Sequence, residues 1–348
     1  QHRFDKDDPG PGEVATGSAN IVSAQLSYRL GDSYVVRLFG DNLLDETYLP
    51  TADDLAADVL RGFSQPQKAI PPKYFYDAEG SRLFDAITEL PEYYPTRTET
   101  AMLRAYADEI AHKAGTGHLL VEPGSGSCTK ARILFEGLQP CAYVPMDISR
   151  DHLRVAAEEV SAEYPWLEVH AACTDFTRLM RLPPDSPEGR RLAFFPGSSI
   201  GNFDPDAAVG FLGMIAAMVG PGGQLLIGVD LKKDKAVLEA AYDDAQGVTA
   251  AFNLNLLARI NRELGADFDL AQWRHKALYN EAQGRIEMHL VARVALQVHL
   301  QGQTFHFAAG ETIHTENSYK YSVAEFRELA AQAGFTTDTV WMDADRLF

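Results

Sequence analysis

Glycines and carboxylates recur in this sequence where apolar runs end. Gly124 and Gly126 follow the run HLLVEP, and glycine lets the backbone approach a ligand closely and adopt positive φ. Asp147 ends the next run, about 20 residues later, where nucleotide-binding folds hold ribose hydroxyls with a carboxylate. Asp175 and Phe176 end a third run, where a carboxylate can accept from an adenine amino group while the ring packs on the base. Neither GxGxxG nor GKS/GKT occurs, so the pattern predicts a nucleotide-like ligand other than NAD or ATP.

These residues need a parallel sheet to bring them together. Five apolar runs are separated by helical stretches such as DHLRVAAEEVSAEY and DAAVGFLGMIAAMV. The five runs are HLLVEPGSGS, CAYVPMDIS, LEVHAACTDF, LAFFPGSSIGNF and GQLLIGVDL. Strands that alternate with helices predict a Rossmann-like, doubly wound α/β sheet that binds ligands at the carboxyl ends of its strands.

One long insertion interrupts this alternation. Residues 232–321 contain a long helical region followed by alternating strand-like runs, so we expect an inserted α+β lobe there. Residues 51–97 read as short helices separated by proline breaks, and we expect them to join that lobe. Residues 98–231 and 322–348 then form the main domain, and the last part is predicted as a helix and a strand that returns to the main sheet.

The first 50 residues differ in texture from the rest. Residues 1–18 are polar and rich in Pro and Gly, which predicts a disordered lead-in. Residues 21–39 contain two β-rich runs around a GDS turn, which predicts a hairpin. Residues 19–49 resemble the closing strands of outer-membrane TonB-dependent receptors, but two strands cannot close a barrel. We therefore interpret residues 1–50 as an extraneous segment that comes from a gene fusion or from a false join in the assembly of the DNA sequence.

Composition narrows the class of protein. The 348-residue chain has a net charge of −18 and no dense Lys/Arg cluster, so we expect no nucleic-acid partner, because an acidic field repels phosphates. Cys128, Cys141 and Cys173 show no CxxC or Cys/His metal spacing, which favours a reducing cytosol. No apolar run approaches the roughly 20 residues of a spanning helix, and QHRFDKDDPGPGE lacks a signal pattern. We therefore expect a cytoplasmic protein without a membrane partner.

Six unusual phrases, in order from about residue 53 to residue 348, carry a family resemblance: PPKYFYDAEGSRLFDAITELPEYYPTRTE, EPGSGSCTK, YVPMDIS, GSSIGNF, AYDDAQGVTAAFN and IHTENSYKY. Together they resemble the histidine-specific Nα-methyltransferases of ergothioneine biosynthesis. The resemblance implies an enzyme that converts L-histidine to its trimethylated betaine, hercynine, with S-adenosylmethionine as methyl donor. It also implies a methyltransferase domain with a second substrate lobe, and we expect a monomer.

The resemblance assigns roles residue by residue. It implies cofactor contacts from Tyr76, Gly124, Lys130, Asp147, Asp175 and Phe176. It implies a histidine pocket made of Tyr93, Asn202, Tyr242, Met288, Glu316 and Ser318.

The chemistry of the second set is coherent. Glu316 and Ser318 lie two apart in a predicted strand, so they face the same way and can bind the two nitrogens of an imidazole. Asn202 and Tyr242 suit the substrate carboxylate or amine, and Met288 suits contact with the ring. Methyl transfer needs a neutral amine aligned with the methyl group, and our hypothesis is that Tyr76 orients the amine and relays its proton to water.

Several other interpretations remain open. The chain is alternatively an N-methyltransferase of another amino acid or small amine, or a non-catalytic S-adenosylmethionine-binding protein. The downstream histidines are irregularly spaced, so we expect exposed or hydrogen-bonded side chains and no metal; they are His289, His299, His306 and His314. Members of the resembled family usually continue past the DADRLF phrase with one more strand, so we expect an open sheet edge or gap there.

Overall fold

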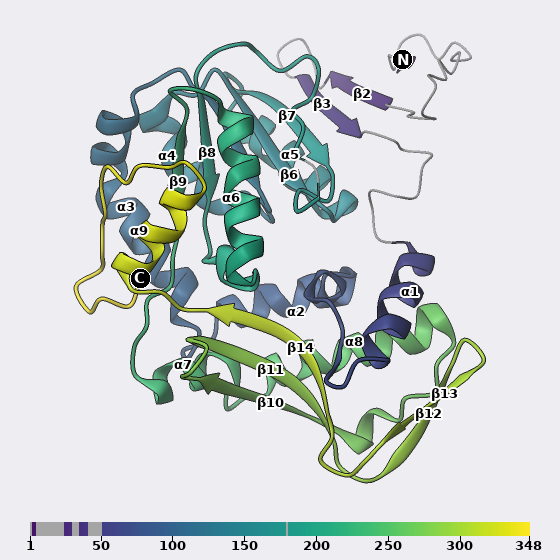
Figure 1. Cartoon of the computed structure of the whole chain (residues 1–348). Coiled ribbons are helices and arrows are strands. Elements are labelled where there is room, and N and C mark those ends of the chain that lie inside the picture. The colour runs from purple at the N-terminus through teal and green to yellow at the C-terminus, as the bar shows by residue number, and fades with distance from the viewer. Residues whose placement is uncertain (1, 5–23, 30–34, 41–50, 179) are drawn as a thin grey trace.

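A parallel sheet with helices on both faces forms the larger part of the protein. The computed structural model describes residues 2–4, 24–29, 35–40, 51–178 and 180–348 (Figure 1). The five predicted strands are β5 (Leu119–Pro123), β6 (Ala142–Asp147), β7 (Glu168–Cys173), β8 (Arg191–Phe195) and β9 (Gln224–Ile227). They pair in parallel in the order β7-β6-β5-β8-β9, so the predicted doubly wound, Rossmann-like α/β fold is confirmed.

Burial explains why these runs form central strands. All five residues of β5 are buried, as in a sheet that is covered on both faces. On one face, Leu119 and Val121 pack in a cluster with α6 (Pro205–Val219) and α9 (Val323–Gln332). On the other face, Leu120 packs in a cluster with three further helices: α3 (Tyr94–Ala114), α4 (Thr129–Leu138) and α5 (Arg150–Glu163).

Three strands near the N-terminus extend this sheet. They are β1 (His2–Phe4), β2 (Ala24–Arg29) and β3 (Val35–Gly40). The two strands predicted within residues 21–39 form an antiparallel pair, and β3 pairs in parallel with β7. The predicted disordered lead-in lies almost entirely outside the described residues, as do the turn between the two strands and residues 41–50.

A second, smaller sheet lies beside the carboxyl ends of the main strands (Figure 1). Its strand order is β10-β11-β14-β4, with a separate hairpin of β12 and β13. The bounds are β4 (Lys68–Ala69), β10 (Trp273–Asn280), β11 (Arg285–Ala292), β12 (Leu296–Leu300), β13 (Gln303–Phe307) and β14 (Thr312–Tyr319). Strand β10 was not predicted.

One hydrophobic cluster joins the second sheet to helices from two parts of the chain. These are α1 (Ala52–Phe63), η1 (Pro72–Phe75), α2 (Ala78–Thr88), α7 (Lys235–Tyr242) and α8 (Val248–Leu264). The long helical region predicted after residue 232 is therefore two helices. The break is stabilised by Asp244, whose carboxylate accepts hydrogen bonds from the backbone N–H groups of Val248 (3.0 Å) and Thr249 (2.7 Å). Short 3₁₀ turns complete the fold: η2 (Ser199–Asn202) and η3 (Leu270–Gln272).

The prediction of a C-terminal strand is wrong. Residues 333–348 form no strand in the structure, and α9 is the last regular element among the described residues. Residues 336–342 instead line a cavity of about 500 Å³ beside β9, the last strand on that side of the sheet. Among the described residues, β9 pairs with β8 and not with this segment.

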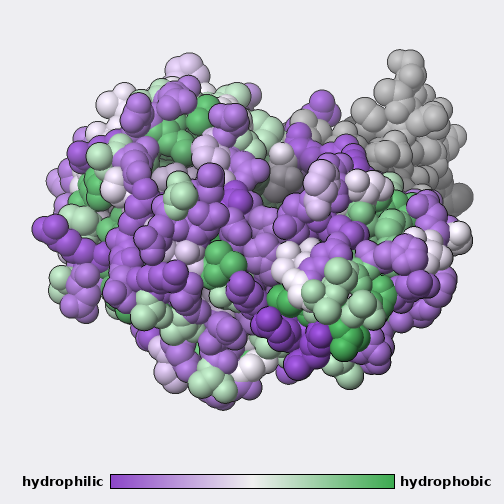
Figure 2. Space-filling model, turned by 60° about the horizontal axis from the view of Figure 1, so that its bottom comes forward, coloured by the Kyte–Doolittle hydropathy of each residue, from purple (hydrophilic) through white to green (hydrophobic). Residues whose placement is uncertain are grey.

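Two surface properties complete the description. None of the helices in the described ranges combines the length and apolar composition that crossing a bilayer requires. Viewed from the side of the second sheet, the surface is mostly hydrophilic, and the clearest hydrophobic area is small and lies on the right of the view (Figure 2).

Candidate active site

The turn between β5 and α4 is shaped by two glycines. Gly124 and Gly126 have φ values of +68° and +50°, which a side chain rarely permits. A Cβ atom on Gly124 would lie 3.1 Å from the Phe176 ring, so this residue must be glycine for the ring to approach. Gly126 faces open space, since no described atom lies within 4 Å of its virtual Cβ. The turn therefore forms a cradle with room for a ligand.

Asp147 closes this cradle from the end of β6. Its carboxylate accepts hydrogen bonds from the backbone N–H groups of Gly126 (3.0 Å) and Ser149 (2.9 Å). Burial raises the pKa of Asp147, so further donors, such as the hydroxyls of a ribose, would stabilise its charged form.

Asp175 and Phe176 follow β7, next to the same sheet edge. The Asp175 carboxylate accepts from the backbone N–H (3.1 Å) and hydroxyl (2.5 Å) of Thr177. The Phe176 ring fills the space beside Gly124. The structure thus brings together the predicted residues from the ends of three strands. The glycine cradle, the buried carboxylate and the aromatic ring fit an adenosine-containing cofactor.

Lys130 has a partner that the sequence did not reveal. Its ammonium group forms an ion pair with Glu99 of α3, which is buried. Glu99 also accepts from the backbone N–H of Gly197, at 2.8 and 2.9 Å to its two carboxylate oxygens. Lys130 therefore holds the loop after β8 through Glu99, and its direct contact with a cofactor stays a prediction.

A second cavity lies between the main sheet and the second sheet. It is narrow, with about 60 Å³ of enclosed space. All six predicted substrate residues and Tyr76 line it: Tyr76, Tyr93, Asn202, Tyr242, Met288, Glu316 and Ser318. Its other lining residues are Phe84, Ile87, Gly197, Ser198, Ser199, Ala241, Thr249 and Phe252. We refer to this cavity as the acceptor pocket.

Strand pairing places the acidic and hydroxyl groups in the acceptor pocket. Glu316 pairs with Met288, and Ser318 pairs with Ile286, in the antiparallel ladder of β14 and β11. The Asn202 amide donates to the Glu316 carboxylate at 3.2 Å. Burial raises the pKa of Glu316 to about 7, and the nearby charge of Lys320 and the hydrogen bond from Asn202 only partly offset this effect. Glu316 is therefore a half-buried acid in the wall of the pocket that titrates near neutral pH.

Tyr76 lines the acceptor pocket. Its ring packs edge-on against Phe84 and Phe252, with centroids 5.8 and 6.0 Å away. Burial raises the pKa of Tyr76, and the nearby charges of Glu316 and Asp147 raise it further. The Tyr76 hydroxyl is therefore close enough to both Glu316 and Asp147 to be affected by their charges, and it stays protonated at neutral pH.

Two charged residues beside the acceptor pocket were missed. The Lys320 ammonium donates to the hydroxyls of Tyr242 and Ser318, both at 2.9 Å, and lies 2.7 Å from the Asp230 carboxylate. The sequence contained one signal for this contact. Glu316, Ser318 and Lys320, the last just past the end of β14, are spaced two apart, and residues two apart along a strand face the same side. A lysine in a polar strand normally reads as solvent-exposed, and Asp230 follows β9, far away in sequence.

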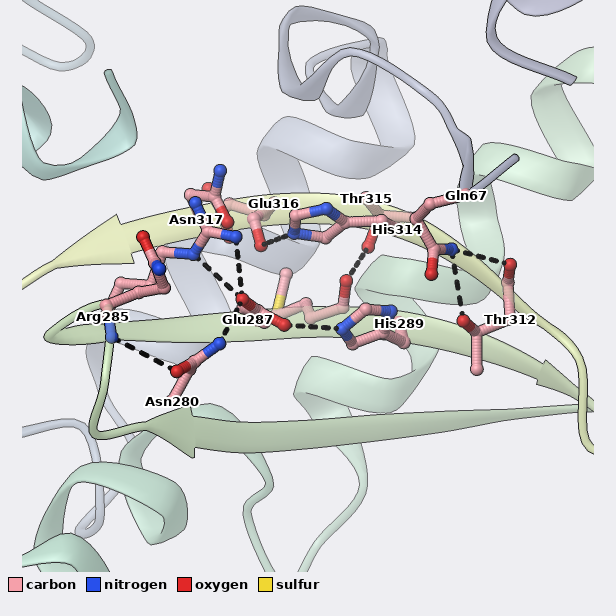
Figure 3. A network of polar contacts seen from close by, with 12 residues as sticks. Gln67, Asn280, Arg285, Glu287, His289, Thr312, His314, Thr315, Glu316 and Asn317 are labelled. Atoms are coloured by element: carbon pink, nitrogen blue, oxygen red, sulfur yellow. Dashed lines mark hydrogen bonds and ion pairs between the residues drawn. The ribbon is translucent and has the colours of Figure 1, made fainter. Parts of the chain in front are cut away.

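The opposite side of the second sheet carries a histidine cluster (Figure 3). A β-bulge between Met288 and His289 lets His314 stand opposite His289, and the two rings stack with centroids 4.7 Å apart. Ligand atoms of Glu287, His289 and His314 lie within 4.8 Å of one another. Protein groups already occupy much of this cluster: the Glu287 carboxylate binds Arg285 (2.7 Å) and His289 (3.2 Å). The cluster lies apart from the acceptor pocket.

The other two histidines that were considered as metal ligands lie on the β12–β13 hairpin. The His299 ring lies 2.7 Å from the Asp267 carboxylate, and His306 is exposed.

Comparisons with known proteins agree with this geometry. A family model described as "Histidine-specific methyltransferase, SAM-dependent" matches residues 55–348. The chain is 45% identical over 298 residues to the histidine N-alpha-methyltransferase of Mycolicibacterium smegmatis, covering 84% of this chain and 92% of that protein. It is 44% identical over 295 residues to the protein of the same name from Mycobacterium tuberculosis, covering 83% and 91%. Ergothioneine biosynthesis protein 1 of Schizosaccharomyces pombe is 29% identical over 279 residues, which cover 76% of this chain and 36% of that protein.

Proposed function

Because this chain belongs to the family of histidine-specific, S-adenosylmethionine-dependent methyltransferases, we propose that it methylates the α-amino nitrogen of L-histidine. Up to three transfers give trimethylhistidine (hercynine), within ergothioneine biosynthesis. One observation carries the proposal: the Glu316 carboxylate and the Ser318 hydroxyl line one pocket together with Tyr76.

The proposed ring site lies on β14. Glu316 accepts the N–H of the imidazole, and the hydroxyl group at Ser318 serves the other nitrogen. Met288 contributes an apolar, polarizable wall, since its side chain is buried opposite Glu316. A side chain without ring nitrogens leaves these polar groups unpaired, which disfavours its binding.

The remaining polar groups suit the amino acid backbone of the substrate. Asn202 has a second amide hydrogen besides the one that it donates to Glu316. Tyr93 lies close to Tyr242, with ring centroids 6.1 Å apart. The sequence favoured Asn202 and Tyr242 for the substrate carboxylate or amine; because the Tyr242 hydroxyl bonds with Ser318, we assign this role to Asn202 and Tyr93.

The glycine cradle holds the methyl donor in this proposal. Gly124 and Gly126 give the backbone access, Asp147 binds the ribose, and Asp175 and Phe176 bind the adenine. When bound, S-adenosylmethionine supplies an electrophilic methyl group on a positively charged sulfur. Residues 98–231 and 322–348 thus hold the donor, while residues 51–97 and 232–321 hold the acceptor.

Tyr76 acts at the reacting nitrogen. Its raised pKa keeps the hydroxyl neutral, so it cannot act as a permanent base. It orients the amine lone pair toward the methyl group by a hydrogen bond, and it passes the released proton to water. Each of the first two transfers leaves a protonated amine that must lose a proton before the next one.

Mass spectrometry tests the proposed function. Incubation of the protein with histidine and S-adenosylmethionine is expected to give mass gains of one, two and three methyl groups. Glu316→Ala is expected to lower this activity by about two orders of magnitude, because an acceptor for the ring N–H is lost. Methylation of another amine in place of histidine favours a related methyltransferase. Cofactor binding without any methylated product favours a non-catalytic binding protein.

We also propose that the enzyme is a cytoplasmic monomer without nucleic-acid or membrane partners. The net charge of −18 and the mostly hydrophilic surface in Figure 2 support this proposal. Light scattering coupled to size-exclusion chromatography tests it, and a dimer mass would contradict it.

A further inference from the structure

A buried ammonium group next to the acceptor pocket has no role in the function proposed so far. The Lys320 side chain is 0% exposed, and its three hydrogens match three acceptors: Asp230 (2.7 Å), Tyr242 (2.9 Å) and Ser318 (2.9 Å). Its ammonium also lies 4.8 Å from the centroid of the Tyr242 ring. Burial acts to lower the pKa of Lys320, but Asp230 and Tyr242 outweigh it and raise the pKa, so the group stays charged.

Asp230 fixes this ammonium group in place. Its carboxylate also accepts from the Tyr94 hydroxyl, at 2.8 and 2.9 Å, and forms an ion pair with Lys233. Its backbone N–H donates to the Ser198 hydroxyl at 2.8 Å. Asp230 is 0% exposed, so neither solvent nor a change of rotamer loosens this arrangement. Lys320 is therefore rigidly oriented toward the two hydroxyl groups.

Counting hydrogens shows what the two hydroxyls offer to the acceptor pocket. The oxygens of Tyr242 and Ser318 are 2.8 Å apart, and each accepts a hydrogen bond from Lys320. One hydroxyl therefore donates to the other. The receiving oxygen then has both lone pairs occupied, by the ammonium and by its neighbour. Its own hydrogen remains, and both residues line the pocket.

We propose that Lys320, held by Asp230, is a positioning residue that turns the Tyr242–Ser318 pair into a hydrogen-bond donor toward the substrate ring. Together with the acceptor at Glu316, this donor selects a ring that carries one N–H and one unprotonated nitrogen, the pattern of a neutral imidazole. The inference rests on the proposed function and adds the residue that sets its ring specificity.

Calorimetry on the full chain with S-adenosylhomocysteine tests the inference without requiring turnover. The readout is the ratio of affinities for histidine and for 2-thienylalanine, whose ring has a similar size but no nitrogen. Lys320→Met is expected to lower this ratio about tenfold, the effect of one buried hydrogen bond. A general packing defect would weaken both ligands equally and leave the ratio unchanged, and that result would overturn the proposal.

Lys233→Met is the matched control. Lys233 also pairs with Asp230, but its ammonium contacts Tyr94 and a backbone carbonyl in place of the two pocket hydroxyls. Its removal is expected to leave the histidine-to-thienylalanine ratio unchanged, and a drop equal to that of Lys320→Met would overturn the proposal. Lys320→Met leaves Asp230 paired with Lys233, so the fold is expected to survive. If it does not, Lys320→Leu, which likewise has no donor, is measured by the same ratio and decides in the same way.

The two proposals fail in different ways. Wild-type protein that produces no methylated histidine contradicts the proposed function. Wild-type protein that methylates histidine, together with a Lys320→Met variant that keeps the wild-type affinity ratio, contradicts only the role of Lys320.

Discussion

Replacement of Glu316 by Gln separates the binding role of this carboxylate from its effect on stability. Burial raises its pKa to about 7 in the native protein, whereas an unfolded chain keeps a value near 4.5. The native state therefore holds a proton that the unfolded state releases. The contribution of Glu316 to stability is therefore largest below about pH 4.5, falls between pH 4.5 and about 7, and is lost above that. A neutral Gln removes this loss.

The expected size follows from the pKa shift. A shift from 4.5 to about 7 corresponds to about 3 kcal/mol at pH 8, as an upper limit, because Glu316 faces a pocket that can admit water. Urea unfolding of the ligand-free protein should show Glu316→Gln to be more stable than wild type by up to that amount at pH 8. The gain should fall below about 1 kcal/mol at pH 5. Histidine affinity should fall about 10- to 100-fold, since the acceptor for the ring N–H is replaced.

Glu287→Gln provides a control of opposite sign on the same sheet. The pKa of Glu287 is lowered to about 2, because hydrogen bonds from Arg285 and Asn280 outweigh burial. Its replacement should therefore destabilise the protein at pH 8. The reasoning about Glu316 is refuted if Glu316→Gln shows an equal gain at both pH values, or a loss at pH 8. Unchanged histidine affinity would instead refute the ring-site assignment.

Three further substitutions test other parts of the site. Tyr76→Phe should lower kcat about 100-fold with little change in the KM for S-adenosylmethionine, and steady-state rates equal to wild type would reject its role. Gly124→Ala should weaken cofactor binding in calorimetry and lower the unfolding free energy by about 1–3 kcal/mol, because φ is +68° and Phe176 is in the way. Asp244→Ala should lower Tm through a loss of about 1–2 kcal/mol, because two N–H groups of α8 lose their acceptor. Donors at this helix end hold the pKa of Asp244 below its ordinary value despite burial, so the difference from wild type should shrink as acid protonates the carboxylate.

The cofactor half of the site could be predicted from the sequence, because local sequence patterns determine where its residues lie. An apolar run followed by a glycine or an acid predicts the end of a buried strand, and parallel strands place such ends at one edge. Gly124 and Phe176, which are far apart in sequence, therefore pack so closely that a Cβ atom on Gly124 would lie 3.1 Å from the ring. Strand β10 was missed because apolar and polar residues do not alternate along its sequence WRHKALYN, although its first four residues alternate between buried and exposed.

Long-range charge pairs could not be predicted from the sequence. Lys130 pairs with Glu99, and Lys320 with Asp230, although each residue alone fits a solvent-exposed position. Tertiary packing decides these pairs, because buried charges persist only where partners from other elements neutralise them. The prediction of a C-terminal strand was also wrong, since the local pattern of residues 333–348 could not show that a cavity, and no paired strand, lies beside β9 among the described residues.

The same few residues join the two sheets and recognise the substrate ring in the proposed function. Immediately after β14, Tyr321 forms a bridge with Leu231, next to Asp230, while Lys320 binds Asp230 and the pocket hydroxyls. The ring site is therefore tied to the end of β9 through only a few bonds. A reaction that requires nitrogen, methyl carbon and sulfur in line tolerates little displacement between donor and acceptor sites. A junction made of buried ionic and backbone hydrogen bonds meets that requirement, because hydrogen bonds are directional as well as short. This need explains why buried charges are placed at the junction, even though apolar residues often give equal stability.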